Sequence, residues 1–140
     1  PDLSITKKRK DPFLKILEKE KGVQTTIQYC INSEEAKQCT AAATAKIPHP
    51  DHIFCMSDEI LIGVMNALKH TPLKIPDDIS VLAISNGFIP SLYNPEISYI
   101  ETSGYELGKL AMKRMLENME SKSAPKSIML PSRFVEGNSL

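Results

Sequence analysis

Short apolar runs alternate with helical stripes along most of the chain. Residues 53–56 form an apolar run, and Ser57 follows with a side chain suited to capping a helix. Residues 59–70 then have a helical apolar pattern, and residues 80–84 form a second apolar run. The stretch 51–84 therefore predicts a strand, a crossover helix and a second strand parallel to the first.

The flanking sequence continues this alternation. It predicts further helices at 11–21, 33–47 and 105–119 and further strands at 23–31, 97–101 and 127–130. The first of these helices is expected to begin at Asp11 as its N-cap, with Pro12 in its first turn. Residues 1–10 are too polar to supply the strand that would precede it, and residues 131–140 read as a polar tail. The order of elements indicates an α/β fold with a parallel sheet flanked by helices.

The helix predicted at 59–70 has more apolar surface than one sheet can cover. Seven of the nine positions from 60 to 68 are apolar. Such a helix is buried on more than one side. Its second side packs either against another part of its own domain or against another subunit, and we favour the subunit because the chain is short.

Composition narrows the class of protein. The chain has 140 residues, of which 41% are hydrophobic and 24% charged, as expected of one soluble globular domain. Basic and acidic residues both number 17, so no net field favours nucleic acid or a membrane surface. No signal peptide and no run of 18 apolar residues is evident, and we expect a cytoplasmic location. Cys30, Cys39 and Cys55 read as small buried residues in a reducing compartment.

The sequence gives little support to catalysis or metal binding. Ser57 and Ser85 lack a neighbouring His and a G-x-S-x-G turn. The glycines form no phosphate-binding loop. His49 and His52 share a loop but are not grouped with cysteines or carboxylates, as a closed zinc site requires. We therefore expect no enzymatic activity, no cofactor and no metal.

Polar residues follow both strands of the 51–84 unit. Ser57 and Asp58 come after the first strand, and Ser85 and Asn86 end the second. Because the carboxyl ends of parallel strands meet at one edge, these side chains could converge on one crevice that suits a polyhydroxylated small molecule. Helix capping alone is the alternative for the first pair. Arg9, within a short basic run, could clamp hydroxyls or a carboxylate with two parallel donors.

Several motifs, taken in order, resemble the LacI/GalR family of bacterial transcription regulators. They lie at residues 50–54, 57–59, 63–68, 75–81, 104–108 and 130–136, so the resemblance covers nearly the whole chain. It implies a fold like the type I periplasmic sugar-binding proteins, in which an effector lies between two α/β lobes joined by three crossings.

The resemblance also implies a division of the chain. Residues 1–94 would form most of the C-terminal lobe, residues 95–122 would belong to the N-terminal lobe, and residues 123–140 would form the final crossing and tail. The DNA-binding helix-turn-helix would lie outside this chain. Operator DNA would therefore be contacted only through that absent domain, with no contact to a membrane.

Carried over by position, the resemblance assigns an effector site. Arg9 matches the arginine that holds the effector, and residues 57–58 match a polar pair at a strand end. Ser85 stands where the family has an aspartate, with Asn86 beside it, and Ile31 stands where an aromatic residue often stacks on the ligand. These departures leave the ligand open.

The family's dimer surface uses the helix matching 59–70 and the loop matching 88–93. The residues that these segments would contribute here are Ile62, Ile89, Leu92 and Tyr93. The resemblance therefore implies a homodimer that senses a sugar-like effector and couples it to DNA binding. The alternative is a periplasmic sugar-binding protein of a transporter, against which the motifs at 75–81 and 130–136 argue.

Overall fold

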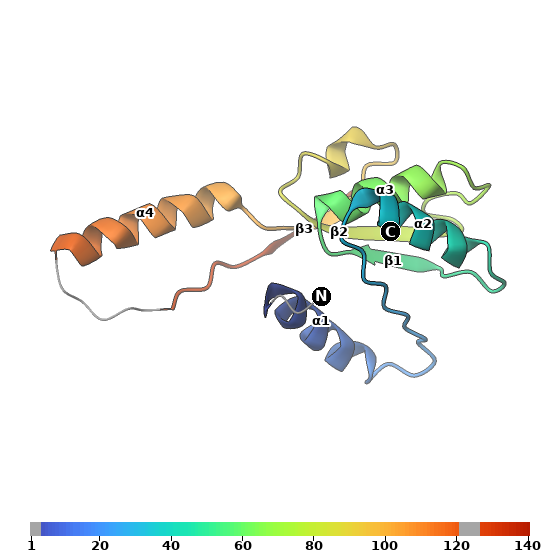
Figure 1. Cartoon of the computed structure of the whole chain (residues 1–140), viewed down its shortest axis with the longest axis horizontal. Coiled ribbons are helices and arrows are strands. Elements are labelled where there is room, and N and C mark those ends of the chain that lie inside the picture. The colour runs from blue at the N-terminus through green and yellow to red at the C-terminus, as the bar shows by residue number, and fades with distance from the viewer. Residues whose placement is uncertain (1–3, 121–126) are drawn as a thin grey trace.

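The computed structural model describes residues 4–120 and 127–140, which form a four-stranded sheet, helices beside it, and one helix that projects away (Figure 1). The elements in chain order are α1 (Ser4–Leu17), α2 (Ser33–Thr44), β1 (His52–Cys55), α3 (Asp58–Leu68), β2 (Ser80–Ser85), the 3-10 turn η1 (Pro90–Leu92), β3 (Ser98–Glu101), α4 (Gly104–Glu120) and β4 (Arg133–Val135).

The sheet has the strand order β1-β2-β3-β4. β1 pairs with β2 in parallel, with Ile53 opposite Val81 and Cys55 opposite Ala83. β2 pairs with β3 in parallel, and β4 joins β3 antiparallel. The strand, helix and parallel strand predicted for residues 51–84 are therefore confirmed, and β4 makes the complete sheet mixed.

The core lies between the sheet and α3. Val81 and Ala83 on β2 are fully buried, and Leu61 on α3 is buried against the same cluster. Alternate residues of a strand point to one face, so this face of the sheet carries the apolar set that α3 covers. Fully burying one such aliphatic side chain stabilises the fold by about 1.5–3 kcal/mol.

α2 packs against α3 and covers part of its second side. Gly63 permits the close approach, because a Cβ there would meet the Ser33 carbonyl oxygen and would lie 2.7 Å from the Ala36 Cβ. Part of the apolar surface of α3 is thus buried within its own chain. The contribution of another subunit stays a prediction.

The first helix differs from its prediction. It spans Ser4–Leu17 rather than 11–21, and Pro12 lies inside it instead of at its start. The basic residues at 7–10 are good helix formers, so the helix begins upstream. It continues across Pro12 although a proline in a helix interior costs about 3 kcal/mol.

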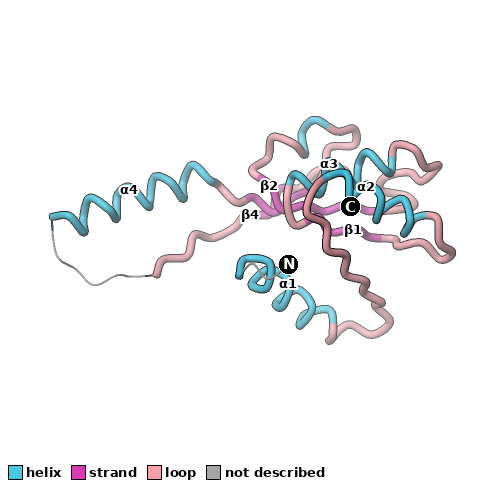
Figure 2. Tube along the Cα trace, in the orientation of Figure 1, coloured by secondary structure: helices cyan, strands magenta, loops and turns pink. Residues whose placement is uncertain are grey.

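Two predicted strands are wrong. Residues 23–30 have no regular secondary structure, and neither do residues 127–132 (Figure 2). A β-branched sequence forms a strand only where a neighbouring strand accepts its hydrogen bonds, and neither segment pairs with a strand within the described residues. The helix predicted to reach Ile47 ends at Thr44, and Ile47 is 99% exposed.

The C-terminal tail is built into the sheet, contrary to the prediction of a polar tail. The Ser139 carbonyl oxygen accepts a hydrogen bond from the Val81 amide at 2.9 Å, and the Ser139 Oγ donates to the Val81 carbonyl oxygen at 2.6 Å. The same Oγ accepts from the Ser98 amide at 2.8 Å. Ser139 is fully buried and thereby joins β2 to β3 beyond their ladder.

α4 projects from the end of β3 and has no buried residue (Figure 1). Several of its apolar side chains, including Leu107, Met115 and Met119, are more than half exposed. No helix in the described ranges is long and apolar enough to span a membrane.

Candidate functional site

The carboxyl ends of β1 and β2 meet at the start of α3. Ser57 is the N-cap of α3, and its Oγ accepts a hydrogen bond from the Ile60 amide at 3.4 Å. The parallel register of β1 and β2 runs to Cys55 opposite Ala83, so the carboxyl ends of the two strands lie side by side. Whether Ser57, Asp58, Ser85 and Asn86 share one crevice stays a prediction.

The polar side chains at the end of β2 are used in the turn that follows. The Ser85 Oγ accepts from the Gly87 amide at 3.0 Å, and the Asn86 Oδ1 accepts from the Phe88 amide at 3.2 Å. Ser85 is buried and Asn86 is exposed. These bonds hold the turn beside the strand end, and they leave the Asn86 amide nitrogen free of the turn.

α1 brings Arg9 to the end of β1. The Arg9 guanidinium donates from one terminal nitrogen to the Met56 carbonyl oxygen at 2.8 Å. One helical turn later, the Phe13 ring lies against the Phe54 ring with a centroid distance of 5.0 Å. Residues spaced four apart on a helix share a face, as do residues spaced two apart on a strand, so the two contacts form one matched interface.

Asp58 supplies a carboxylate beside these groups. Its Oδ1 is buried and makes no hydrogen bond within the described part of the chain. A buried acceptor without a donor costs about 1–3 kcal/mol, and more when it is charged. The N-terminus of α3, where this carboxylate lies, offsets part of that cost through the helix dipole.

Ile31 differs from these residues because its side chain is exposed to solvent. Its side chain is 79% exposed, and its amide donates to the Glu35 Oε2 at 3.0 Å. The Ser33 amide donates to the Glu59 Oε1 at 2.7 Å, which places the start of α2 beside the start of α3. Ile31 is therefore at the same end of the two helices as Ser57, with its side chain turned to solvent.

Two acidic residues at this end were missed by the sequence reasoning. Hydrogen bonds from the hydroxyl and the amide of Ser33 lower the pKa of Glu59. Glu101 is the register partner of Ser85 on β3, and it forms an ion pair with Arg133 at 3.0 Å. The end of the predicted strand at 97–101 could have identified Glu101, because parallel strands bring their last residues to one edge.

These groups provide hydrogen bonds and charge. Arg9 supplies cationic donors, and Asp58 supplies an acceptor. Within residues 4–120 and 127–140, no group of three or more His, Cys, Asp or Glu is arranged to hold a metal ion. The arrangement is suited to binding a small polar molecule.

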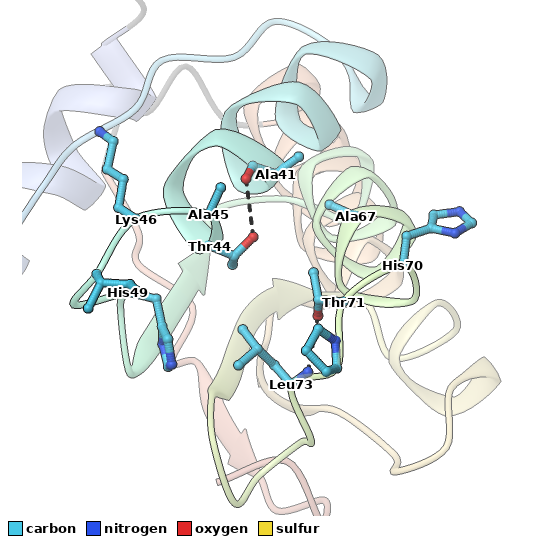
Figure 3. Close-up of a pocket in the computed structure, with 11 residues that line it drawn as sticks. Ala41, Thr44, Ala45, Lys46, His49, Ala67, His70, Thr71 and Leu73 are labelled. Carbon is cyan, nitrogen blue, oxygen red and sulfur yellow. Dashed lines mark hydrogen bonds between the residues drawn. The ribbon is translucent and has the colours of Figure 1, made fainter.

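A cavity of about 510 Å³ lies elsewhere, at the opposite ends of α2 and α3 (Figure 3). Ala41, Thr44 and Ala67 are among its lining residues, and the side chains of Lys46 and His70 extend away in different directions. None of the predicted effector residues lines it.

Comparison with known proteins decides the family. Residues 1–140 match the family of periplasmic binding protein-like domains. The chain belongs to this family. The fold prediction is confirmed by the likeness to a solved LacI family transcriptional regulator from Arthrobacter sp. FB24 in complex with lactose. That structure has a TM-score of 0.84 and 22% sequence identity, and the match covers 94% of this chain and 50% of the other.

Curated relatives of this periplasmic binding protein-like chain are transcription regulators. The HTH-type transcriptional regulator RegA of Clostridium acetobutylicum is 33% identical over 78 residues, which are 56% of this chain and 23% of RegA. The HTH-type transcriptional repressor PurR of Vibrio campbellii is 32% identical over 85 residues, which are 61% of this chain and 25% of PurR. The resemblance to LacI/GalR regulators is thus confirmed. The chain spans about a quarter of the length of these relatives.

Proposed function

We propose that this chain is part of the ligand-sensing domain of a LacI-type transcription regulator. The ligand would be a sugar or a related small polar molecule, bound where the strands β1 and β2 end. The contact between Arg9 and the Met56 carbonyl oxygen carries the proposal, because it joins residues 47 positions apart and brings a guanidinium to Ser57 and Asp58.

The chemistry of the strand ends supports a polyhydroxylated ligand. A sugar hydroxyl can donate to the Asp58 carboxylate and accept from Arg9. The regulator from Arthrobacter sp. FB24 was solved with lactose, which agrees with this class of ligand.

The proposed mechanism is a shift between two arrangements of the lobes. A ligand changes the balance only by binding one arrangement more tightly than the other. α1 carries Arg9 and contacts β1 through one ring pair, so ligand bonds to Arg9 would fix α1 against the sheet. DNA binding would respond through a helix-turn-helix outside this chain.

The remaining parts of the proposal follow the family. Residues 1–94 would form most of the C-terminal lobe and residues 95–122 would belong to the N-terminal lobe. Residues 123–140 would form the final crossing and tail. The complete protein would be a cytoplasmic homodimer without enzymatic activity. A surface around Leu92 and the adjacent α3 would join the two copies. The exposure of α4 is consistent with a second lobe that packs on it.

Calorimetry of the full-length protein against a panel of sugars and nucleobases tests the site. Arg9→Ala should weaken binding of the identified ligand about 10- to 100-fold, because losing hydrogen bonds to a charged group costs about 1.5–3 kcal/mol. Lys15→Ala removes the same charge from the same helix at an exposed position and should leave the affinity unchanged. Equal affinity of Arg9→Ala and wild type would contradict the assignment of Arg9.

A further inference from the structure

Two of the three free cysteines lie near each other in the fold. Cys30 ends the segment 23–30 that has no strand partner, and Cys39 lies on α2. Both are half-buried, whereas Cys55 is fully buried in the core. The prediction that all three are buried is therefore wrong for Cys30 and Cys39, and both remain open to reagents.

The turn into α2 fixes how Cys30 meets the helix. The Glu35 amide donates to the Asn32 Oδ1 at 2.8 Å, and the Glu35 Oε2 accepts from the Ile31 amide at 3.0 Å. This pair resembles a capping box, except that Glu35 bonds the amide of the residue before the N-cap Asn32, and it orders the residues just before the helix. Cys39 is one helical turn after Glu35 and shares its face. The Glu35 carboxylate, which holds the Ile31 amide, thus brings the adjacent Cys30 toward the face of α2 that carries Cys39.

The two thiols are in contact. A side-chain hydrogen bond joins Cys30 to Cys39. Burial, this bond and electrostatic repulsion from Cys39 and Glu35 raise the pKa of Cys30 to about 11. The raised pKa disfavours the thiolate of Cys30, and the thiolate is the nucleophile in cysteine chemistry, so the first attack on an oxidant is assigned to Cys39.

We propose that Cys30 and Cys39 form a reversible intramolecular disulfide when a peroxide oxidises the protein. The Cys39 thiolate attacks one peroxide oxygen, the O–O bond breaks, and hydroxide leaves, which gives a sulfenic acid at Cys39. The Cys30 sulfur then attacks the Cys39 sulfur and loses its proton, and the sulfenic oxygen leaves as water. Two thiols have lost two electrons in total, and the peroxide has taken them up.

The disulfide would fasten an otherwise unpaired segment to α2. Segment 23–30 connects α1 to α2, and Tyr29 within it accepts a hydrogen bond from Lys10 on α1 at 3.1 Å. A covalent link at Cys30 would restrict this connection. The disulfide itself does not depend on the identity of the ligand or on DNA binding.

Peptide mapping of the full-length protein tests the proposal. The folded protein is treated with hydrogen peroxide, its free thiols are blocked with N-ethylmaleimide, and it is digested with trypsin. Oxidation should join the peptides 22–37 and 38–46, with loss of alkylation at both Cys30 and Cys39. Dithiothreitol should restore both sites. Cys55 serves as the internal control, and it should be alkylated only after unfolding because it is fully buried.

Single variants identify the order of the steps. Cys30→Ser removes the resolving thiol, so Cys39 should stop at a sulfenic acid that dimedone traps. Cys39→Ser should abolish both the linked peptides and the dimedone adduct. Full alkylation of Cys30 and Cys39 after peroxide treatment would overturn the proposal. Separate oxidation of the two thiols without linked peptides, or a link to Cys55, would overturn it as well.

Discussion

Glu59 joins the beginnings of two helices through its carboxylate. It lies in the first turn of α3 and accepts a hydrogen bond from the Ser33 amide, the first residue of α2. Together with the Ser33 hydroxyl, this bond lowers the pKa of Glu59 below the ordinary value of 4.5. The charged form of Glu59 is thus stabilised in the folded state, so the free energy of unfolding depends on pH through this residue.

We predict that Glu59→Gln changes the acid dependence of stability. The stabilisation from charged Glu59 is complete above pH 4.5 and is lost as the pH falls through the lower pKa of the folded state. Wild type should therefore be more stable than the variant above pH 4.5, and the two should converge in stronger acid. Urea unfolding of the 140-residue chain between pH 3 and pH 7 measures this, and a constant difference over that range would refute it.

Sequence reasoning at this scale succeeded where a side chain acts on its near neighbours. Ser57 as a helix cap is an example, because a polar residue just before an apolar stripe has few other uses. It failed for Ser139, whose partners are 41 and 58 positions away in the chain. It also failed for Cys30, whose burial depended on a strand that did not form.

Among the described helices, α2 and α3 form the most extensive contact, and Gly63 is the residue that allows it. A Cβ at this position would meet backbone atoms of Ser33, which cannot move without shifting the start of α2. The pair also positions the Ser33 amide for Glu59. The distance between α2 and α3 and the hydrogen bond from the Ser33 amide to Glu59 therefore depend on each other.

We predict that Gly63→Ala destabilises the chain by about 1–3 kcal/mol, the usual cost of overpacking. Gly108→Ala is the matched control, since Gly108 also lies in a helix but has open space around its Cα. The control should be stabilised by about 0.5–1 kcal/mol, because alanine favours the helix. Equal changes in the free energy of unfolding for the two substitutions, measured by urea unfolding of the 140-residue chain, would show that the close approach at Gly63 does not decide stability.

The elements that sequence reasoning predicted well have their partners within the chain. β1, α3 and β2 follow one another and pack together, so their apolar patterns report contacts that form. The predicted strands at 23–31 and 127–130 have strand-like patterns but pair with no strand among the described residues. Propensity reports what a segment can form, and the pairing strand decides whether it does so.

The described part of the chain has one well-packed region and several apolar surfaces that no other described segment covers. The core cluster gathers around α3 and β2, whereas α4 has no buried residue. Leu92 is 62% exposed, and the nearby Ile89 and Tyr93 pack partly against the core. A cavity of about 410 Å³ adjoins this loop and is lined by Met65 and Tyr93. These features support the dimer surface proposed from the family.

We predict that Leu92→Glu weakens self-association of the full-length protein. Each subunit of a twofold dimer would lose one buried leucine, worth about 1.5–3 kcal/mol, so the dissociation constant should rise at least about 100-fold. Ile47→Glu is the control, because Ile47 is 99% exposed beyond the other end of α2. Sedimentation equilibrium measures both, and an unchanged dissociation constant for Leu92→Glu would exclude this surface.

The fold class and family could be predicted because several motifs occur in one order along the chain. The strand ends could be placed together, since parallel pairing fixes which residues meet. Predicting the contact of Arg9 with Met56 would have required the position of α1, and the predicted boundaries of this helix were wrong. Long-range connections of this kind depend on three-dimensional packing that local patterns do not encode.

The junction that Ser139 makes between β2 and β3 has a consequence for biosynthesis. The ribosome makes Ser139 after Val81 and Ser98, by 58 and 41 residues respectively. Until then, the backbone groups that later bond to Ser139 can form hydrogen bonds only with water. The two strands can therefore begin to pair while the chain is still emerging, but their junction closes only after the tail has left the ribosome.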